Sequence, residues 1–389
     1  MWALSMKLPS TTKRNNHNMY WPFRVFQPSF MFIYILGIAV MLSINVQAIS
    51  LLQLQQQGSK SNPFPPPSTC FTTKSGLPVC RYALGGAARS TQPSSLPGEY
   101  MNHLLSTDKD DNKFTLGAPF YFYYNPHRYP AFVSGLRDAL ASCCTAQNET
   151  RGFSSRHDVF LASGGAEFSK NAMEQRLQDA LQAGGETDYL DAFILEYICP
   201  SDTTRQSDDI DAVNVSWQLN DDVVGAIQQA QAWKQQGLIR YVGASTHSHR
   251  VGATLAQHAG IDCVMIRYNM AHQKAAQTIS FPACIQHQKP VLAFTTTRWN
   301  ALQKGHVEWN DKDNQPPTTG DCLSYALASS PPVEVVLHSA RDEKELQNAL
   351  IGFHANMSAE EMNKWATYGN LEWNDIDSFD EYPEEESSP

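Results

Sequence analysis

The sequence predicts an α/β fold of the (β/α)₈ TIM-barrel class, with an N-terminal hairpin and a preceding signal or anchor segment. Short apolar runs alternate with segments of helical periodicity over about 300 residues, as in parallel βαβ units. Seven or eight such units can be counted, which suits a closed barrel better than an open sheet. The phosphate-binding loops of Rossmann and P-loop proteins are missing, because neither G-x-G-x-x-G nor G-x-x-x-x-G-K-[ST] occurs.

The expected strands and helices follow from these patterns. Strands are predicted at residues 81–86, 118–124, 157–162, 191–195, 239–245, 263–269, 290–294 and 333–338. Helices are predicted at 171–185, 221–236, 248–258, 273–287, 320–329 and 342–353. In the first of these helices, Met173, Leu177 and Leu181 recur every four residues before a Gly-Gly stop.

Composition and charge exclude one class of partner. The chain of 389 residues is 42% hydrophobic and 17% charged, which is ordinary for a globular protein. All 39 acidic residues lie at or after Glu99, where only 21 Lys and Arg accompany them, so this part carries a charge of about −18. Such a surface repels phosphate backbones, and nucleic acid is therefore not an expected partner.

The N-terminus has the features of a targeting segment. Four basic residues precede the apolar run 30–42, and a polar stretch of small residues ends at a plausible cleavage point after Ala48. Residues 1–48 are therefore interpreted as a signal peptide or as an uncleaved signal-anchor, which would tether the protein to a membrane through residues 30–48. Either interpretation predicts entry into the secretory pathway.

The remaining chain divides into three predicted parts. Residues 49–67, rich in Gln, Ser and Pro, form a linker or a transit segment; a transit segment after a signal would fit plastid import through the ER. Without it, the ER lumen or the extracellular space is the expected site. Residues 68–368 form the barrel, and residues 369–389, with eight acids and no base, form an acidic tail.

The cysteines and histidines predict little chemistry of their own. Cys70 and Cys80 flank the turn "KSGL" and could bridge a hairpin in an oxidising compartment. The chain contains no C-x-x-C. His247 and His249 form an H-x-H, but no neighbouring acid or cysteine completes a ligand set, so no metal site is expected.

Five segments, in order, carry a resemblance to a known family. They are "LGG" (84–86), "TDYLDAFILEY" (187–197), "KQQGLIRYVGASTHS" (234–248), "YALASSPPVEVVLHSARDEKELQNAL" (325–350) and "MSAEEMNKW" (357–365). Their order and spacing resemble the aldo/keto reductase superfamily over residues 70–368. The resemblance implies a (β/α)₈ barrel that binds NADP(H) and transfers a hydride to the carbonyl of a small molecule.

The resemblance also implies a catalytic set of Asp, Tyr, Lys and His, from which this chain departs. Tyr129 stands at the Tyr position, Tyr124 at the Asp position, Gly164 at the Lys position and Glu196 at the His position. The tyrosine is therefore expected to lack a neighbouring cation. Such a cation matters because a phenol of pKa about 10 is a poor acid at neutral pH.

Glu196 and Tyr129 are nevertheless the candidate catalytic residues. A Glu at the His position resembles the subgroup that reduces carbon–carbon double bonds next to a carbonyl, where the acid polarises the enone. A carboxyl group in an apolar pocket has a raised pKa and can donate a hydrogen bond at neutral pH. The alternative for Glu196 is a carboxylate at a strand end that is bonded to backbone amides. The alternative for Tyr129 is an aromatic side chain that lines the barrel mouth.

The resemblance further implies the cofactor contacts. Ser245 and Thr246 would hold the nicotinamide carboxamide, Phe294 would stack on its ring, and Ser339 with Arg341 would meet the 2′-phosphate at a helix N-terminus. Core packing is the alternative for Ser245 and Phe294. A surface ion pair with an acid of the following helix is the alternative for the arginine.

Two functions follow from these observations. The first is an NADP(H)-binding oxidoreductase with altered catalytic residues that reduces a carbonyl or a conjugated enone. The second is a catalytically silent barrel that binds a nucleotide, a ligand or a protein.

Overall fold

The computed structural model shows a closed barrel of parallel strands, which confirms the predicted fold class. It describes residues 70–86, 92–105, 119–143, 156–185, 187–205, 217–309, 315–329, 332–353, 357–371 and 373. The predicted signal, linker and acidic tail lie outside these residues, apart from the first few residues of the tail. Within the described ranges, no helix is both long and apolar enough to cross a membrane.

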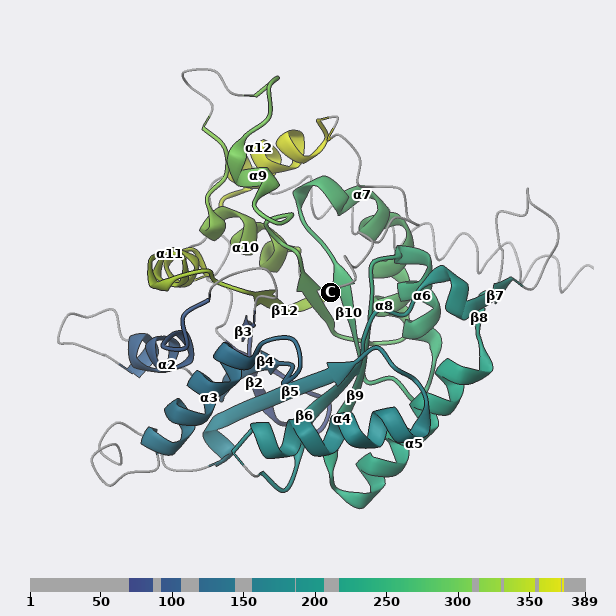
Figure 1. The fold of residues 1–389 in the computed structure, drawn as a ribbon. Helices are drawn as coiled ribbons and strands as arrows, with labels where there is room; N and C mark the ends of the chain where they lie inside the picture. Colours follow the sequence, from purple (N-terminus) through teal and green to yellow (C-terminus); the bar gives the residue numbers. More distant parts are fainter. Residues whose placement is uncertain are drawn as a thin grey trace, which may run out of the picture. The chain divides into compact units, whose positions relative to one another are not determined.

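Eight buried strands form the barrel, and each coincides with a predicted segment. They are β3 (Tyr82–Gly85), β4 (Phe120–Tyr124), β5 (Val159–Gly165), β6 (Leu190–Leu195), β9 (Ile239–Thr246), β10 (Cys263–Arg267), β11 (Val291–Phe294) and β12 (Val333–His338). The strand order around the barrel is β10-β11-β12-β3-β4-β5-β6-β9. Figure 1 shows the strands at the centre with helices around them, so both faces of each strand are covered.

The principal helices are α2 (Leu96–Leu105), α3 (Pro130–Cys143), α4 (Lys170–Ala183), α5 (Asp221–Gln236), α6 (His249–Gln257), α10 (Thr319–Ala328), α11 (Glu343–Phe353) and α12 (Ala359–Gly369). Helix α5 has both of its expected end signals. The Asn220 side chain accepts a hydrogen bond from the amide of Val223, and Gly237 ends the helix at φ 79°. Helix α2 was not predicted, because Pro97 and Gly98 are typical of loops; a proline is tolerated in a first turn.

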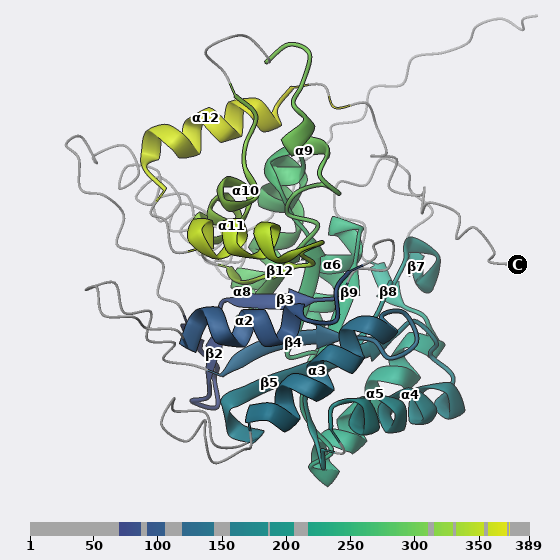
Figure 2. The ribbon, with the colours of Figure 1, turned by 60° about the vertical axis from the view of Figure 1, so that its left-hand side comes forward.

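One predicted helix is interrupted. The segment 273–287 forms α7 (Gln273–Ala275), a π-helical stretch η5 (Ala276–Ser280) and α8 (Phe281–Gln286). Beyond the barrel, the short α9 (Ala301–Lys304) lies beside α12 in both views (Figures 1 and 2), where the Tyr368 hydroxyl donates to the Leu302 carbonyl at 2.6 Å.

Two small antiparallel sheets accompany the barrel. Strands β7 (Thr203–Arg205) and β8 (Trp217–Leu219) form one, and β1 (Cys70–Thr72) and β2 (Pro78–Cys80) form the predicted hairpin. Cys70 and Cys80 pair directly across the hairpin, but no disulfide joins them, so the suggested bridge is not formed. The hydroxyls of Thr73 and Ser75 bond Tyr241 near the start of β9, which places the hairpin at the N-terminal end of the barrel.

Asp191, at the start of β6, ties that same end together. Its Oδ2 accepts hydrogen bonds from Arg156 and from the amide of Leu161, each at 2.8 Å, and its Oδ1 accepts one from Arg240 at 2.8 Å. The guanidinium carbons of Arg156 and Arg240 each lie over the Tyr189 ring, 4.3 Å from its centroid. A buried carboxylate with every oxygen paired is a structural anchor.

Candidate active site

Glu196 follows β6 directly, at the carboxyl end of the strand where barrel enzymes carry their sites. Its backbone amide donates to the Gly165 carbonyl at 2.9 Å, which fixes it beside the end of β5. The side chain is only 4% exposed, and Oε1 accepts a hydrogen bond from the Tyr123 hydroxyl. Oε2 is buried and has no hydrogen-bond partner among the residues that the structure describes.

Burial raises the pKa of the Glu196 carboxyl above its ordinary value. The Tyr123 hydrogen bond, the charges of Arg128 and Arg176 and the side chain of Asn125 oppose the rise. Burial and the nearby Glu196 also raise the pKa of Tyr123, so its hydroxyl keeps the proton that it donates. Because Oε1 is occupied, a proton on the carboxyl would sit on Oε2 and could be donated to a ligand oxygen.

Tyr129 lies in the same cluster, immediately before α3. Its ring packs against Gly86, where a Cβ atom would lie 2.3 Å from the tyrosine ring, so only glycine leaves room for it. Burial raises the pKa of the Tyr129 phenol, and the nearby Tyr197 and Glu196 add to the rise, whereas Arg128 lowers it. The structure therefore brings the two candidate catalytic residues together.

The expectation that the tyrosine lacks a neighbouring cation is wrong. The side chain of Arg128, the preceding residue, is hydrogen-bonded to Tyr129. Its guanidinium carbon also lies 4.8 Å from the centroid of the Tyr197 ring, which is a cation–π contact. The sequence holds one signal of this arrangement, namely that the arginine is adjacent to the tyrosine.

Tyr124 and Gly164, which stand at the Asp and Lys positions of the family, make different contacts from those that the resemblance implies. Tyr124 points away from the cluster and donates its hydroxyl to the Ala180 carbonyl in α4 at 2.7 Å. The next residue, Asn125, is 2% exposed and donates its Nδ2 to the Gly164 carbonyl at 3.3 Å. A Cβ atom on Gly164 would lie 2.2 Å from the backbone oxygen of Ile194, so no side chain fits there without backbone movement.

Sequence reasoning missed Tyr123 and Asn125 for the same reason. Adjacent side chains of a strand face opposite sides, so the phase of β4 decides which aromatic residue of "FYFYY" faces the interior. An unbroken aromatic run carries no alternation from which that phase could be predicted.

The hydroxyl oxygens of Ser245 and Thr246, the predicted nicotinamide contacts, already accept hydrogen bonds from backbone amides of the protein. The Ser245 Oγ accepts the amide of Tyr197 at 2.9 Å, and the residue is 7% exposed. Thr246 is completely buried, and its Oγ1 accepts the amide of Ser248 at 3.0 Å, so in this conformation it offers no surface to a ligand.

Phe294 lies at the end of β11 and is half-buried among other rings. The imidazole of His247 meets it edge-on at 4.9 Å, and stacks on Tyr197 at 6.0 Å and on Trp299 at 6.2 Å. Burial and the nearby Arg267 lower the pKa of His247 to about 4, so this imidazole is neutral at physiological pH. Tyr197 and Trp299 have φ of 57° and 51°, a strained conformation for aromatic residues.

The predicted phosphate contacts lie where β12 leads into α11. Ser339 donates its hydroxyl to the Gly86 carbonyl at 2.8 Å. The Arg341 side chain is 58% exposed and donates Nε to Glu345 at 2.8 Å, which is the ion pair considered as the alternative. Asp342 already accepts the amide of Glu345 at 2.8 Å, so an acid occupies this helix N-terminus.

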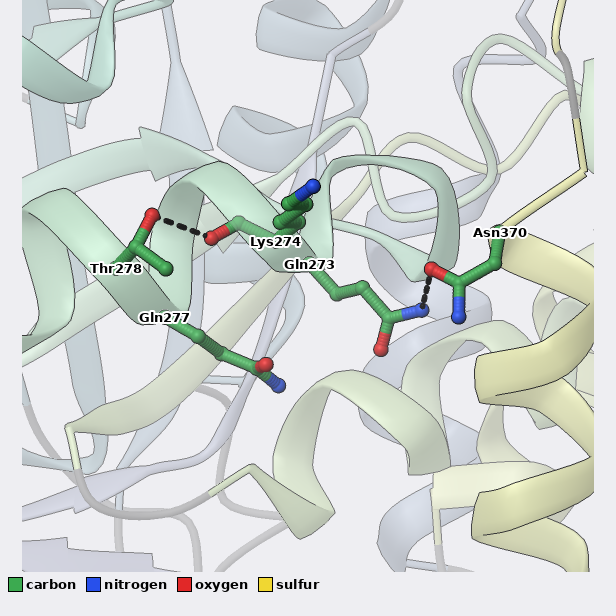
Figure 3. Close-up of a pocket in the computed structure, with 5 residues that line it drawn as sticks. All are labelled: Gln273, Lys274, Gln277, Thr278 and Asn370. Carbon is green, nitrogen blue, oxygen red and sulfur yellow. Dashed lines mark hydrogen bonds between the residues drawn. The ribbon is translucent and has the colours of Figure 1, made fainter.

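A separate polar hollow lies away from this cluster (Figure 3). Gln273, Lys274, Gln277, Thr278 and Asn370 line about 580 Å³ between α7, η5 and the residue after α12. The Gln273 amide already donates to the Ala366 carbonyl and to Asn370, at 2.8 and 3.2 Å. No buried carboxyl or barrel strand end contributes to it, so it is not the candidate active site.

Comparisons with known proteins agree with this architecture. Residues 153–321 match the sequence model of the aldo/keto reductase family. The fold is similar to the holo form of an aldo-keto reductase from Bacillus halodurans, with a TM-score of 0.54 and 16% identity over 77% of this chain and 96% of that chain. A thermostable aldo-keto reductase in complex with the inhibitor epalrestat gives a TM-score of 0.51 and 16% identity, over 77% and 98% of the two chains. No curated protein sequence matches this chain.

Proposed function

We propose that this barrel is a member of the aldo/keto reductase superfamily and that it is a nicotinamide-nucleotide-dependent oxidoreductase with altered catalytic residues. Its expected substrate is a small molecule with a conjugated enone or, less readily, a simple carbonyl. NADPH is the expected nucleotide.

The unpaired Oε2 of Glu196 is the observation that carries this proposal. A buried carboxyl oxygen without a partner costs free energy, by about 1–3 kcal/mol or more for a charged group. Burial raises the pKa of this carboxyl, so it holds its proton to a higher pH than an exposed glutamate does, and its protonated form would have a donor to offer. A purely structural acid at a strand end would have both oxygens bonded, as Asp191 does.

The residues around the mouth fit a nucleotide in part. Arg341 has an exposed guanidinium that can meet a phosphate, and the half-buried Phe294 can meet a planar ring. Ser245 accepts one hydrogen bond and keeps its hydroxyl proton to donate to a carboxamide oxygen. Thr246 does not fit, because it is completely buried. The nucleotide, when bound, would supply a hydride.

The chain's own residues would then act on the substrate oxygen. Tyr123 holds Oε1 of Glu196, so the carboxyl proton on Oε2 is directed to that oxygen and polarises the enone. Tyr129 provides a second hydroxyl beside it. Oε2 is buried in this conformation, so a ligand could reach it only if neighbouring side chains moved.

A titration with NADPH and NADH, followed by assays with cyclohexenone and benzaldehyde, tests the proposal. We expect nucleotide binding, slow or absent benzaldehyde reduction, and residual activity directed at the enone. Glu196→Gln should lower enone reduction by about 10²–10⁴-fold, the usual contribution of a general acid, without changing nucleotide affinity. Glu360→Gln, an exposed change on α12, is the matched control. Brisk benzaldehyde reduction that survives Glu196→Gln would reject the role of this acid.

A silent binding barrel is the second candidate. It is favoured by Gly164, whose site admits no lysine, and by the internal bonds of Thr246 and Ser339. The same titration separates the two candidates, because a silent barrel would oxidise no NADPH with either substrate.

A further inference from the structure

A buried asparagine presents Arg128 and Tyr129 side by side. The Asn125 Oδ1 accepts the amides of His127 and Arg128 at 3.1 and 3.2 Å, and the Asn125 carbonyl accepts the amide of Tyr129 at 3.0 Å. This Asx turn fixes the backbone of both residues before α3 begins. The turn therefore fixes the point from which the arginine side chain leaves the backbone.

The guanidinium of Arg128 meets three groups of the candidate site. It lies over the Tyr197 ring, hydrogen-bonds Tyr129 and Tyr197, and acts electrostatically on Glu196. Burial alone would lower the pKa of Arg128, but these neighbours outweigh it and raise the pKa, so the group remains a cation.

The other charged and titratable groups near Glu196 come from several elements. Tyr123 approaches from β4, Tyr129 from the start of α3 and Arg176 from α4. Arg176 is bound by Glu167, at 2.6 Å between Nη2 and Oε1, which offsets its charge. Arg128 therefore lowers the pKa of the Glu196 carboxyl more than Arg176 does.

We propose that Arg128 is the positioning cation of this site: acting through Tyr129 and Glu196, it stabilises negative charge on the substrate oxygen that these two residues contact. The inference rests on the proposed function. Such a cation would stand in for the lysine that the resemblance places at position 164, where Gly164 leaves no room for a side chain. Its charge would come from the turn before α3 instead of from the end of β5. An arginine held over a tyrosine ring keeps its orientation at little cost, which suits a positioning role.

The first test measures the protonation of Glu196 in the intact protein without nucleotide. Infrared difference spectra against Glu196→Gln isolate the carboxyl band of this residue as pH is varied. Arg128→Gln should raise the pH of its ionisation by about one unit, since a nearby opposite charge commonly lowers a carboxyl pKa by about 1–3 units. Arg128→Lys should restore most of the shift, and Arg137→Gln, exposed on α3, should cause none.

The second test measures NADPH-dependent reduction of cyclohexenone. Arg128→Gln should lower kcat about 10- to 100-fold with little change in KM or in NADPH affinity, and Arg128→Lys should recover most of it. If the unmodified protein turns over no enone, the proposed function fails, but the infrared titration still decides whether Arg128 controls this carboxyl. If the enone is reduced and Arg128→Gln moves neither kcat nor the carboxyl band, the arginine is structural and this inference is overturned. If Arg128→Gln does not fold, Arg128→Met serves as the second uncharged variant.

Discussion

Two buried carboxyl groups lie at opposite ends of strand β6, and the fold treats them differently. Asp191, 1% exposed, accepts bonds from two arginines and a backbone amide. Glu196, 4% exposed, has one oxygen bonded to Tyr123 and the other unpaired among the described residues. The comparison teaches that two buried acids of one strand can differ in how their oxygens are paired, and the unpaired oxygen, not burial, is what favours the proposed role of Glu196.

The largest expected effect is the loss of stability when Asp191, the fully paired carboxylate of β6, is replaced. Asp191→Ala leaves Arg156 and Arg240 without their shared carboxylate, and should lower the free energy of unfolding by about 3–5 kcal/mol. Chemical denaturation measures this, with the exposed Asp138→Ala on α3 as the control. A loss below about 1 kcal/mol would place Asp191 among ordinary surface ion pairs and remove the contrast.

At the rim of the mouth, Arg341→Ala tests whether its charge is available to a ligand. We expect NADPH to bind more tightly than NADH, and the variant to lose most of that preference, worth about 1.5–3 kcal/mol or roughly 10–150-fold. Isothermal titration with both nucleotides measures it, and Lys344→Ala on the same helix is the control. Equal affinity for the two nucleotides in the unmodified protein would mean that Glu345 alone is the partner of this arginine.

A substitution of Gly164, which has no room for a side chain, should cause a smaller loss of stability. Gly164→Ala places a Cβ atom against the Ile194 backbone and should destabilise the fold by about 1–3 kcal/mol. Gly225→Ala is the matched control, because nothing lies within 4 Å of that position in α5 and alanine should stabilise the helix by up to about 1 kcal/mol. Equal effects of the two changes would contradict the close packing between β5 and β6.

The smallest effect is the pH dependence contributed by Glu196. Its pKa is raised in the folded state, so the native protein holds this proton above the ordinary value of 4.5, and stability falls as pH rises through the folded pKa. Glu196→Gln should remove that decline, which denaturant titrations across the pH range would detect. Glu345 gives the opposite sign: despite burial, His338 and Arg341 lower its pKa to about 2, so its contribution is lost as pH falls toward that value. A Glu196→Gln variant with an unchanged pH profile would show that this carboxyl ionises as it does in the unfolded chain.

The sequence by itself determined the eight strands, most of the principal helices and the resemblance to the aldo/keto reductase superfamily, but not helix α2 or the break within residues 273–287. These depend on local signals: apolar runs and helical periodicity mark each element, and caps such as Asn220 and Gly237 mark the ends. It also placed Glu196 correctly at the end of β6, because strand position follows from the run of buried residues before it.

Only the tertiary structure decided which side chains meet in the mouth. Tyr123 faces Glu196 and Tyr124 faces α4 because the phase of a strand reverses the face of every residue, and that phase is set by packing against neighbouring strands. Arg128 reaches Tyr129 and Tyr197 because a buried Asx turn and two different strand ends converge, which no local pattern encodes. Gly164 is closed to a side chain for the same reason, since the obstructing atom belongs to the backbone of the adjacent strand.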